Sequence, residues 1–158
     1  MDKLKKVSGL RNNVVIRKAV LADIDAMADL MELLFVAESG FAYDKFRQCQ
    51  GLSLLLSSDN YCLIAAELNR SIIGMCTAQL MVSTAAGGVK ALIEDLVVAE
   101  AYQGCGIGQR LLAEILQWAE SRGAKRMDLL ADCRNSRALT FYEGLGWRKT
   151  NLVCLQKD

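Results

Sequence analysis

The sequence predicts an α/β fold, with a mostly antiparallel mixed sheet of about six or seven strands and about four flanking helices. Three strand-like segments, 61–68, 72–82 and 89–98, follow one another with short turns between them, which is typical of an antiparallel meander. A strand, a helix and a strand then occupy 89–132, and such a passage needs a crossover between parallel strands. The sheet is therefore expected to be mixed.

The N-terminal half predicts a strand, two helices and a hairpin. Residues 14–19 form a short apolar strand, and 21–39 repeat apolar residues near helical spacing. A second helix is expected over 44–57, although Gly51 interrupts its pattern. The polar turn "NRS" at 69–71 is short enough to join the first two meander strands tightly.

The C-terminal half continues with a helix from Ile107 to Gly123, where glycine suits a helix C-terminus. A strand over 126–132 follows, and Asn135 is a suitable cap for a further helix, "SRALTFYEGLG". The last segment, 147–157, is expected to add one or two strands.

Length and composition predict one domain over 1–158, with a flexible start at 1–13 and no second domain. The chain has 53% hydrophobic residues, enough to fill a core. Nineteen basic and 18 acidic residues give a net charge of +1, so no general nucleic-acid surface is expected. No apolar run approaches membrane-spanning length, and no leader-like apolar segment follows the basic start, which favours a cytoplasmic setting without membrane association.

The six cysteines form no C-x-x-C pair, and the chain has no histidine to share a metal. Several of them lie inside apolar runs. They are therefore interpreted as mainly buried free thiols, with neither a disulfide framework nor a metal site.

The stretch "AYQGCGIGQRLL" places three glycines, Gly104, Gly106 and Gly108, between a strand and a helix. Glycine lets a ligand approach the backbone closely, and the first N–H groups of a helix favour an anion. The dinucleotide pattern G-x-G-x-x-G fails, because the third glycine would fall on Gln109 or Leu111. A P-loop fails as well, because no Lys-Ser or Lys-Thr follows the glycines.

The pattern that does fit is Q-x-x-G-x-G, and with it the sequence resembles the GNAT family of N-acetyltransferases. Their signature is [Arg or Gln]-x-x-G-x-[Gly or Ala] between a strand and a long helix. The segments "LIEDLVV" before it and "NSRALTFYEGLGW" after it resemble the family's flanking segments, so three elements over 92–147 occur in the family's order. Two departures are Ala99 and Glu100 where the family usually has a proline nearby, and Gln103 in place of the commoner arginine.

The resemblance implies acetyl-CoA as cosubstrate and a sheet that parts beside "LIEDLVV" to admit its pantetheine arm. Backbone groups at the strand end would bind that arm, with Val98 aligning it and Leu96 facing the acetyl carbonyl. The glycine turn would bind the pyrophosphate. The implied cofactor-binding residues are Leu96, Val97, Val98, Gln103, Gly104, Cys105, Gly106, Ile107, Gly108, Gln109 and Asn135.

Acetyl transfer to an amine requires proton transfer, because at a lysine-like pKa of about 10.4 only roughly one amine in a few thousand is neutral at pH 7. Without histidine, carboxylates, tyrosines and relayed water remain. By resemblance, Tyr142 is the expected general acid and Glu94 the expected base, with Asp95 in reserve. Because side chains alternate along a strand, Glu94 and Asp95 are expected on opposite faces.

The implied function is an N-acetyltransferase that acts on a small-molecule or peptide amine. Nothing in the sequence identifies that acceptor, and the resemblance allows a homodimer that no sequence feature establishes. Two alternatives stay open: a non-catalytic acyl-CoA-binding or sensing domain, and a nucleotide-binding module.

Overall fold

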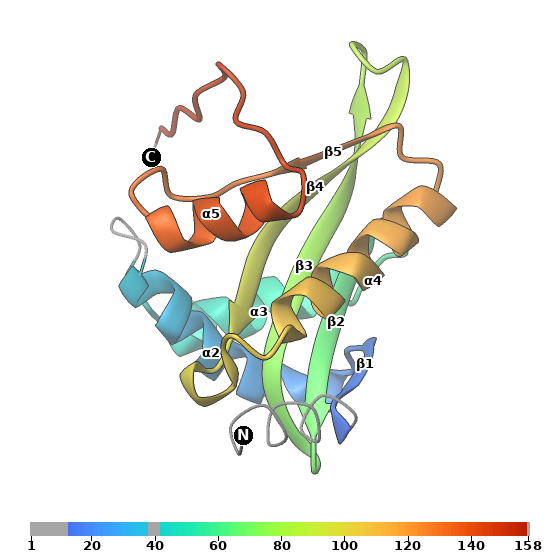
Figure 1. Ribbon diagram of the computed structural model, residues 1–158. Coiled ribbons are helices and arrows are strands. Elements are labelled where there is room, and N and C mark those ends of the chain that lie inside the picture. Colours follow the sequence, from blue (N-terminus) through green and yellow to red (C-terminus); the bar gives the residue numbers. More distant parts are fainter. Residues whose placement is uncertain (1–12, 38–41, 158) are drawn as a thin grey trace.

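The structure, a computed structural model, describes residues 13–37 and 42–157 and contains a five-stranded mixed sheet (Figure 1). The strands are β1 (Val15–Lys18), β2 (Tyr61–Leu68), β3 (Ser71–Ser83), β4 (Gly88–Val98) and β5 (Arg126–Leu129). They lie in chain order across the sheet; β1 to β4 pair antiparallel, and β5 pairs parallel with β4. The predicted fold class is confirmed.

The number of strands is smaller than predicted, because the segment 147–157 contains no strand. Its apolar side chains Leu152, Val153 and Leu155 are 83%, 78% and 88% exposed. Strand preference alone does not make a strand, which also needs a hydrogen-bonding neighbour. The expected flexible start lies outside the described residues, apart from residue 13.

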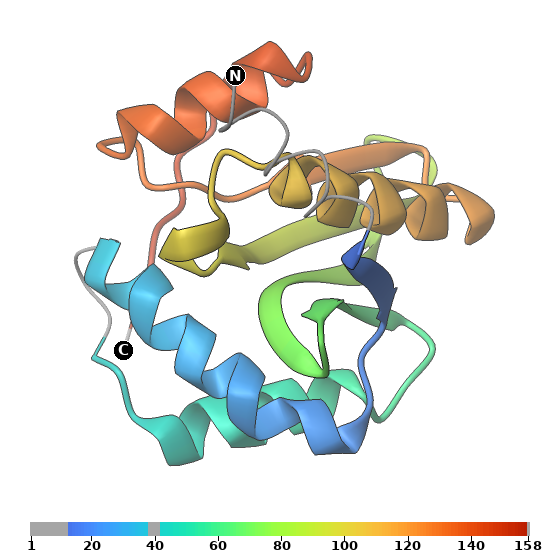
Figure 2. The same cartoon turned by 60° about the horizontal axis from the view of Figure 1, so that its bottom comes forward.

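Helices cover both faces of the sheet. They are α2 (Ile24–Ala37), α3 (Lys45–Leu55), α4 (Ile107–Ser121) and α5 (Ser136–Gly144), with short 3-10 turns at η1 (Leu21–Asp23) and η2 (Glu100–Tyr102). Figure 2 shows the blue and cyan helices α2 and α3 on one face and the orange helices α4 and α5 on the other. Each face has its own buried apolar cluster.

The two clusters share the central strands. Leu63 and Ile64 are both buried, but Leu63 belongs to the cluster that contains Met27 of α2, whereas Ile64 belongs to the cluster that contains Leu111 of α4. Successive strand residues point to opposite faces, so the sequence of a strand that is covered on both sides is a continuous run of apolar residues. Each fully buried aliphatic side chain contributes about 1.5–3 kcal/mol through the hydrophobic effect.

Residues close in sequence set a helix start and a turn, and the predicted tight turn at 69–71 is confirmed. Asp44 caps α3 by accepting hydrogen bonds from the N–H groups of Phe46 and Arg47, at 3.1 and 3.3 Å. The β2–β3 turn places Asn69 and Arg70 at φ of 50° and 67°, the left-handed backbone typical of a tight hairpin. The predicted helix over 21–39 is found as η1 followed by α2, and residues 38 and 39 lie outside the described part.

All six cysteines are free thiols, but only Cys62 and Cys76 are fully buried; Cys133 and Cys154 are exposed. Within 13–37 and 42–157, no helix is long and apolar enough to cross a membrane.

Candidate active site

The glycine turn ends in a helix start that no side chain caps. Gly104 and Gly106 have φ of 74° and 77°, a left-handed backbone that glycine adopts without strain. Gly106 is the N-cap of α4, and the first helical bond runs from the Arg110 N–H to the Gly106 carbonyl at 3.3 Å. Whereas Asp44 caps α3 and Asn135 caps α5, α4 has no side-chain cap. The first-turn N–H groups of Ile107, Gly108 and Gln109 are therefore suited to an anionic ligand.

The side chains of Gln103 and Ile107 anchor the glycine turn to the rest of the fold. Gln103 donates a hydrogen bond from Nε2 to the Val98 carbonyl at 2.8 Å, which joins the turn to the end of β4. Ile107 is buried in the cluster on the α4 side, so any contribution to a ligand would come from its backbone. A Cβ on Gly108 would lie 3.6 Å from Phe141 of α5, which shows how closely α4 and α5 approach each other here.

The sheet parts between β4 and β5, as expected. Pairing of these two strands runs from Lys90 with Arg126 to Ile93 with Leu129, and a further bond joins the Leu130 N–H to the Ile93 carbonyl at 3.2 Å. Beyond Ile93, β4 continues to Val98 without a β5 partner. This unpaired part of β4 lies next to the glycine turn, because Gln103 of the turn is hydrogen-bonded to the Val98 carbonyl.

Backbone groups along this edge point in alternating directions. The Ala99 N–H donates to the Ile73 carbonyl of β3 at 2.9 Å, and antiparallel pairing alternates, so Val97 also directs its N–H and carbonyl towards β3. The backbone groups of Leu96 and Val98 point to the parted edge instead. Backbone pairing at this edge is therefore open to Leu96 and Val98, whereas the backbone of Val97 is already paired with β3.

A β-bulge overturns the prediction that Glu94 and Asp95 point to opposite faces. Cys76 pairs with Leu96 and Ala78 with Ile93, so two β4 residues lie opposite the single residue Thr77. Thr77 donates a hydrogen bond to Asp95 Oδ2 at 2.9 Å, and Gln79 Nε2 donates to Glu94 Oε2 at 2.9 Å.

Thr77 and Gln79 are two residues apart on β3, so their side chains lie on the same face of the sheet. Met75 lies on this face too, in the apolar cluster that contains residues of α2. The inserted residue thus brings both carboxylates to the α2 and α3 side. Regular alternation along β4 would instead place the two carboxylates on opposite faces.

The two carboxylates differ in their environments. Glu94 is exposed, whereas Asp95 is partly buried. Burial raises the pKa of the Asp95 carboxyl above its ordinary value, the hydrogen bond from Thr77 opposes that rise, and the nearby charge of Glu94 adds to it.

Helix α5 contributes Asn135 and Tyr142 from the other face of the sheet. The Asn135 side-chain oxygen accepts a hydrogen bond from the Ala138 N–H at 3.0 Å, so Asn135 is the N-cap of α5. Tyr142 is 9% exposed, and its ring packs edge-on against Phe141 and Trp147, with centroids 5.2 and 6.5 Å away. Tyr142 and the glycine turn belong to the α4 side, and the carboxylates belong to the α2 side.

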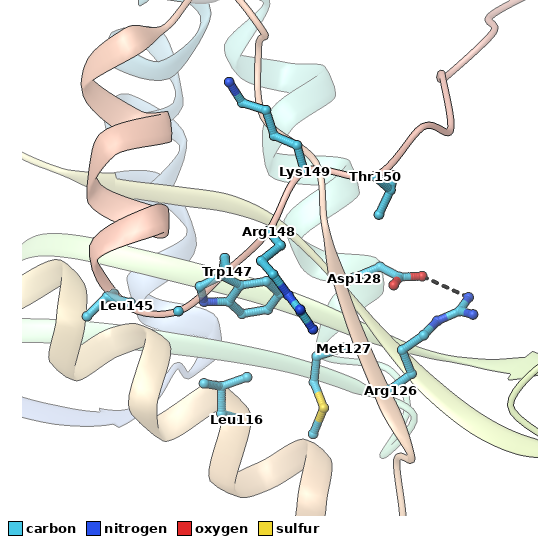
Figure 3. A pocket seen from close by; sticks show the side chains of 10 residues that line it. Leu116, Arg126, Met127, Asp128, Leu145, Trp147, Arg148, Lys149 and Thr150 are labelled. Atoms are coloured by element: carbon cyan, nitrogen blue, oxygen red, sulfur yellow. Dashed lines mark hydrogen bonds and ion pairs between the residues drawn. The ribbon is translucent and has the colours of Figure 1, made fainter.

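A hollow of about 640 Å³ lies elsewhere, along the outer edge of β5. Figure 3 shows Trp147 and Leu116 across this hollow from Arg126 and Asp128, which form an ion pair of 3.1 Å. The hollow shares no residue with the predicted site. It borders β5, which is an edge strand of the sheet because segment 147–157 forms no strand. Among the described residues, no group of three or more cysteine or carboxylate side chains is arranged to hold a metal ion.

Residues 24–147 match the Acetyltransferase (GNAT) family, and the chain belongs to this family. An uncharacterised N-acetyltransferase of Methanocaldococcus jannaschii is 26% identical over 153 residues, 94% of this chain and 66% of that protein. The chain thus spans about two thirds or less of the length of the curated relatives it matches.

Solved structures share the fold. A transcriptional regulator from Bacillus halodurans C-125 has a TM-score of 0.80 and 26% identity, over 92% of this chain and 99% of that one. An aminoglycoside N-acetyltransferase in complex with CoA has a TM-score of 0.78 and 16% identity, over 92% of this chain and 94% of that one. At that identity the second likeness supports the fold alone.

Proposed function

We propose that this chain is an N-acetyltransferase that transfers the acetyl group of acetyl-CoA directly to a primary amine in a ternary complex. One observation carries the proposal: the uncapped start of α4, with left-handed Gly104 and Gly106, lies beside the β4 edge that β5 has left. A helix start suits a diphosphate, and an unpaired strand edge suits an extended amide-containing arm. Coenzyme A has both groups, in that order along its length.

The glycine turn would bind the pyrophosphate through backbone N–H groups from Gly104 to Gln109, with Gln103 holding the turn against Val98. The pantetheine arm would pair with Leu96 and Val98, and Asn135 would approach it from α5. The thioester would then lie near the bulge that carries Glu94 and Asp95. The two reactants would then meet across the parted sheet, and their alignment supplies much of the rate.

The proton transfers are assigned to groups on the two faces of the sheet. Glu94, the exposed carboxylate of the bulge, takes a proton from the ammonium through water. The neutral amine forms the C–N bond to the acetyl carbon, and the C–S bond then breaks. Tyr142 gives its proton to the departing thiolate and regains one from the amine nitrogen, so one proton is released for each acetyl group transferred.

The acceptor is a small-molecule or peptide amine, and its site is expected on the α2 and α3 side of the bulge. A cytoplasmic setting and a homodimer stay predictions.

Two measurements test the proposal. Acetyl-CoA, CoA and NAD are compared in a thermal shift assay, since a ligand that binds the folded state raises its stability. Release of free thiol from acetyl-CoA is then followed with a panel of amino sugars, diamines, amino acids and peptides. Stabilisation by CoA together with amine-dependent thiol release supports the proposal.

The other outcomes separate the alternatives. Binding of CoA without turnover on the whole panel would indicate a non-catalytic acyl-CoA-binding or sensing domain. Binding of NAD without binding of CoA would indicate a nucleotide-binding module.

A further inference from the structure

Thr77 is a buried polar residue at the point where β4 bulges. It is 2% exposed and lies within the buried β3 run 73–78. Its hydroxyl accepts a hydrogen bond from the Asp95 N–H at 3.1 Å and donates one to Asp95 Oδ2 at 2.9 Å. A buried hydroxyl is costly unless it is satisfied, and these two bonds satisfy it. Thr77 thus fixes both the backbone and the carboxylate of the same residue.

Asp95 differs from the other buried or partly buried carboxylates of the described chain in having no cation beside it. Asp23 pairs with Arg17 at 2.7 Å, Asp128 with Lys90 at 2.9 Å, and Asp132 with Arg134 at 2.9 Å. For Asp95, the charged group that acts on it is Glu94, which has the same sign. A partly buried carboxylate without a counter-charge is unfavourable in its ionised form, and a cation from outside the chain would offset that cost.

The position of Asp95 is suited to that role. It is next in sequence to Leu96, whose backbone faces the parted edge where the thioester arm would lie. Its side chain lies on the opposite face from Tyr142, among the residues that share a surface with α2. A cation held by Asp95 would therefore approach the thioester from the acceptor side.

We propose that Asp95 binds the ammonium group of the acceptor and that Thr77 is the positioning residue that orients Asp95 for it. The inference rests on the proposed function and specifies its substrate class: a primary amine that arrives as a cation. Asp95 then governs acceptor binding, whereas Glu94 receives the proton.

Binding depends on the ionised form of Asp95, so acceptor affinity falls as the pH drops through the carboxyl pKa. The titratable neighbours that act on it or respond to it are Glu94 of the bulge and the buried Cys76 thiol of β3. On α2, Asp25 and Asp29 pair with Lys45 of α3, at 3.1 and 2.6 Å, and have their own counter-charge. A bound ammonium lowers the pKa of Asp95, because it favours the charged form.

Three variants test the inference with the best amine of the panel. Thr77→Val has a similar shape but lacks both hydrogen bonds, Thr77→Ser keeps the hydroxyl, and Asp95→Asn removes the charge. A hydrogen bond to a charged group corresponds to about a tenfold to hundredfold effect. Thr77→Val is expected to raise KM for the amine about tenfold and Asp95→Asn about a hundredfold, while kcat changes less and the KM for acetyl-CoA is unchanged.

The pH profile distinguishes positioning from packing. Without the Thr77 hydroxyl that holds the Asp95 pKa down, the acidic limb of kcat/KM for the amine is expected at higher pH in Thr77→Val. Thr77→Ser is expected to keep the wild-type limb. Wild-type acceptor KM and pH profile in Thr77→Val, or a shifted limb in Thr77→Ser, would overturn the inference.

Calorimetry keeps the test separate from turnover and from folding of the Thr77 variants. Benzylamine, an ammonium at pH 7, and phenylhydrazine, which has a similar shape and is largely neutral, are titrated into the wild-type and Asp95→Asn proteins loaded with CoA. Tighter binding of benzylamine in the wild type, lost in Asp95→Asn, supports the inference even if no amine is acetylated. Equal affinities for the two probes in both proteins reject it, whether or not acetyl transfer occurs.

Discussion

The Gln103 side chain donates a hydrogen bond of 2.8 Å to the Val98 carbonyl and thereby fixes the glycine turn relative to the parted edge of β4. The bond joins the element proposed to hold the pyrophosphate to the element proposed to hold the arm. Their spacing has to match one ligand, so a defined bond between them pre-organises the site. Gln103 is therefore more than a neutral substitute for the arginine of many relatives.

Two substitutions of Gln103 separate the effect of its hydrogen bond to Val98 from the effect of the missing positive charge. Gln103→Leu removes the donor and is expected to weaken acetyl-CoA binding about two- to tenfold, the net contribution of one hydrogen bond. Gln103→Arg can keep a donor to Val98 and adds a positive charge, worth about 1 kcal/mol at close range in water. It is expected to bind acetyl-CoA more tightly at low salt and to lose that gain as salt screens the charge. Isothermal titration at two salt concentrations checks both; equal affinity in all three proteins would contradict the role.

The left-handed backbone of Gly106 provides a second prediction. An L-residue in this conformation costs roughly 1–2 kcal/mol. Gly106→Ala is therefore expected to lower the unfolding free energy and also to displace the N–H groups that meet the diphosphate. Gly123 has the same φ of 77° at the other end of α4, away from the turn, so Gly123→Ala is the matched control.

Both glycine variants should lose similar stability, but only Gly106→Ala should lose affinity for acetyl-CoA. Chemical denaturation and titration with acetyl-CoA measure the two quantities. Parallel losses of affinity in both variants would show that the turn acts through stability alone.

The sequence predicted the features that depend on neighbouring residues. The apolar stripe of α4, its left-handed Gly123, the Asn135 cap and the tight turn at Asn69 all follow from residues within a few positions of one another. The three-part resemblance similarly located the glycine turn and the parted strand. These signals are local, and the structure confirms them.

The features that were missed depend on pairing across the sheet. Nothing within "LIEDLVV" distinguishes a regular strand from one with an extra residue, because the bulge exists only relative to Thr77 on β3. The backbone direction of Val97 is set by the same register. The expected C-terminal strands failed for a related reason: Leu152 and Val153 have strand preference, but a strand also requires a partner.

Tyr142 yields a third prediction, about the leaving group. Tyr142→Phe keeps the aromatic contacts with Phe141 and Trp147 and removes only the hydroxyl. If the hydroxyl donates to the departing thiolate, kcat is expected to fall about a hundredfold or more while affinity for acetyl-CoA is unchanged.

Tyr61→Phe, at a half-buried position on β2 outside the site, is the control. It is expected to behave like the wild type in the same assay of thiol release. Wild-type turnover in Tyr142→Phe across the pH range would remove Tyr142 from the mechanism.

Asp95 yields a fourth prediction, about stability. Burial raises the folded-state pKa of Asp95 above its unfolded value, which is near 3.9. A raised pKa means that the folded state favours the protonated carboxyl, so the stability it contributes is present below the unfolded pKa and is lost as pH rises through the folded pKa. At pH 7 the ionised, unpaired carboxylate is therefore a cost to the folded protein.

Asp95→Asn removes that cost while keeping an oxygen that can accept from Thr77. It is expected to be more stable than the wild type at pH 7, and the difference is expected to shrink as pH falls towards 4. For a chain of this size, each 1 kcal/mol corresponds to roughly 2–4 °C in Tm. Melting curves in phosphate buffer, which contains no amine, measure the difference at each pH. A variant that is less stable than the wild type at neutral pH would show that Asp95 already has a favourable partner in the free protein.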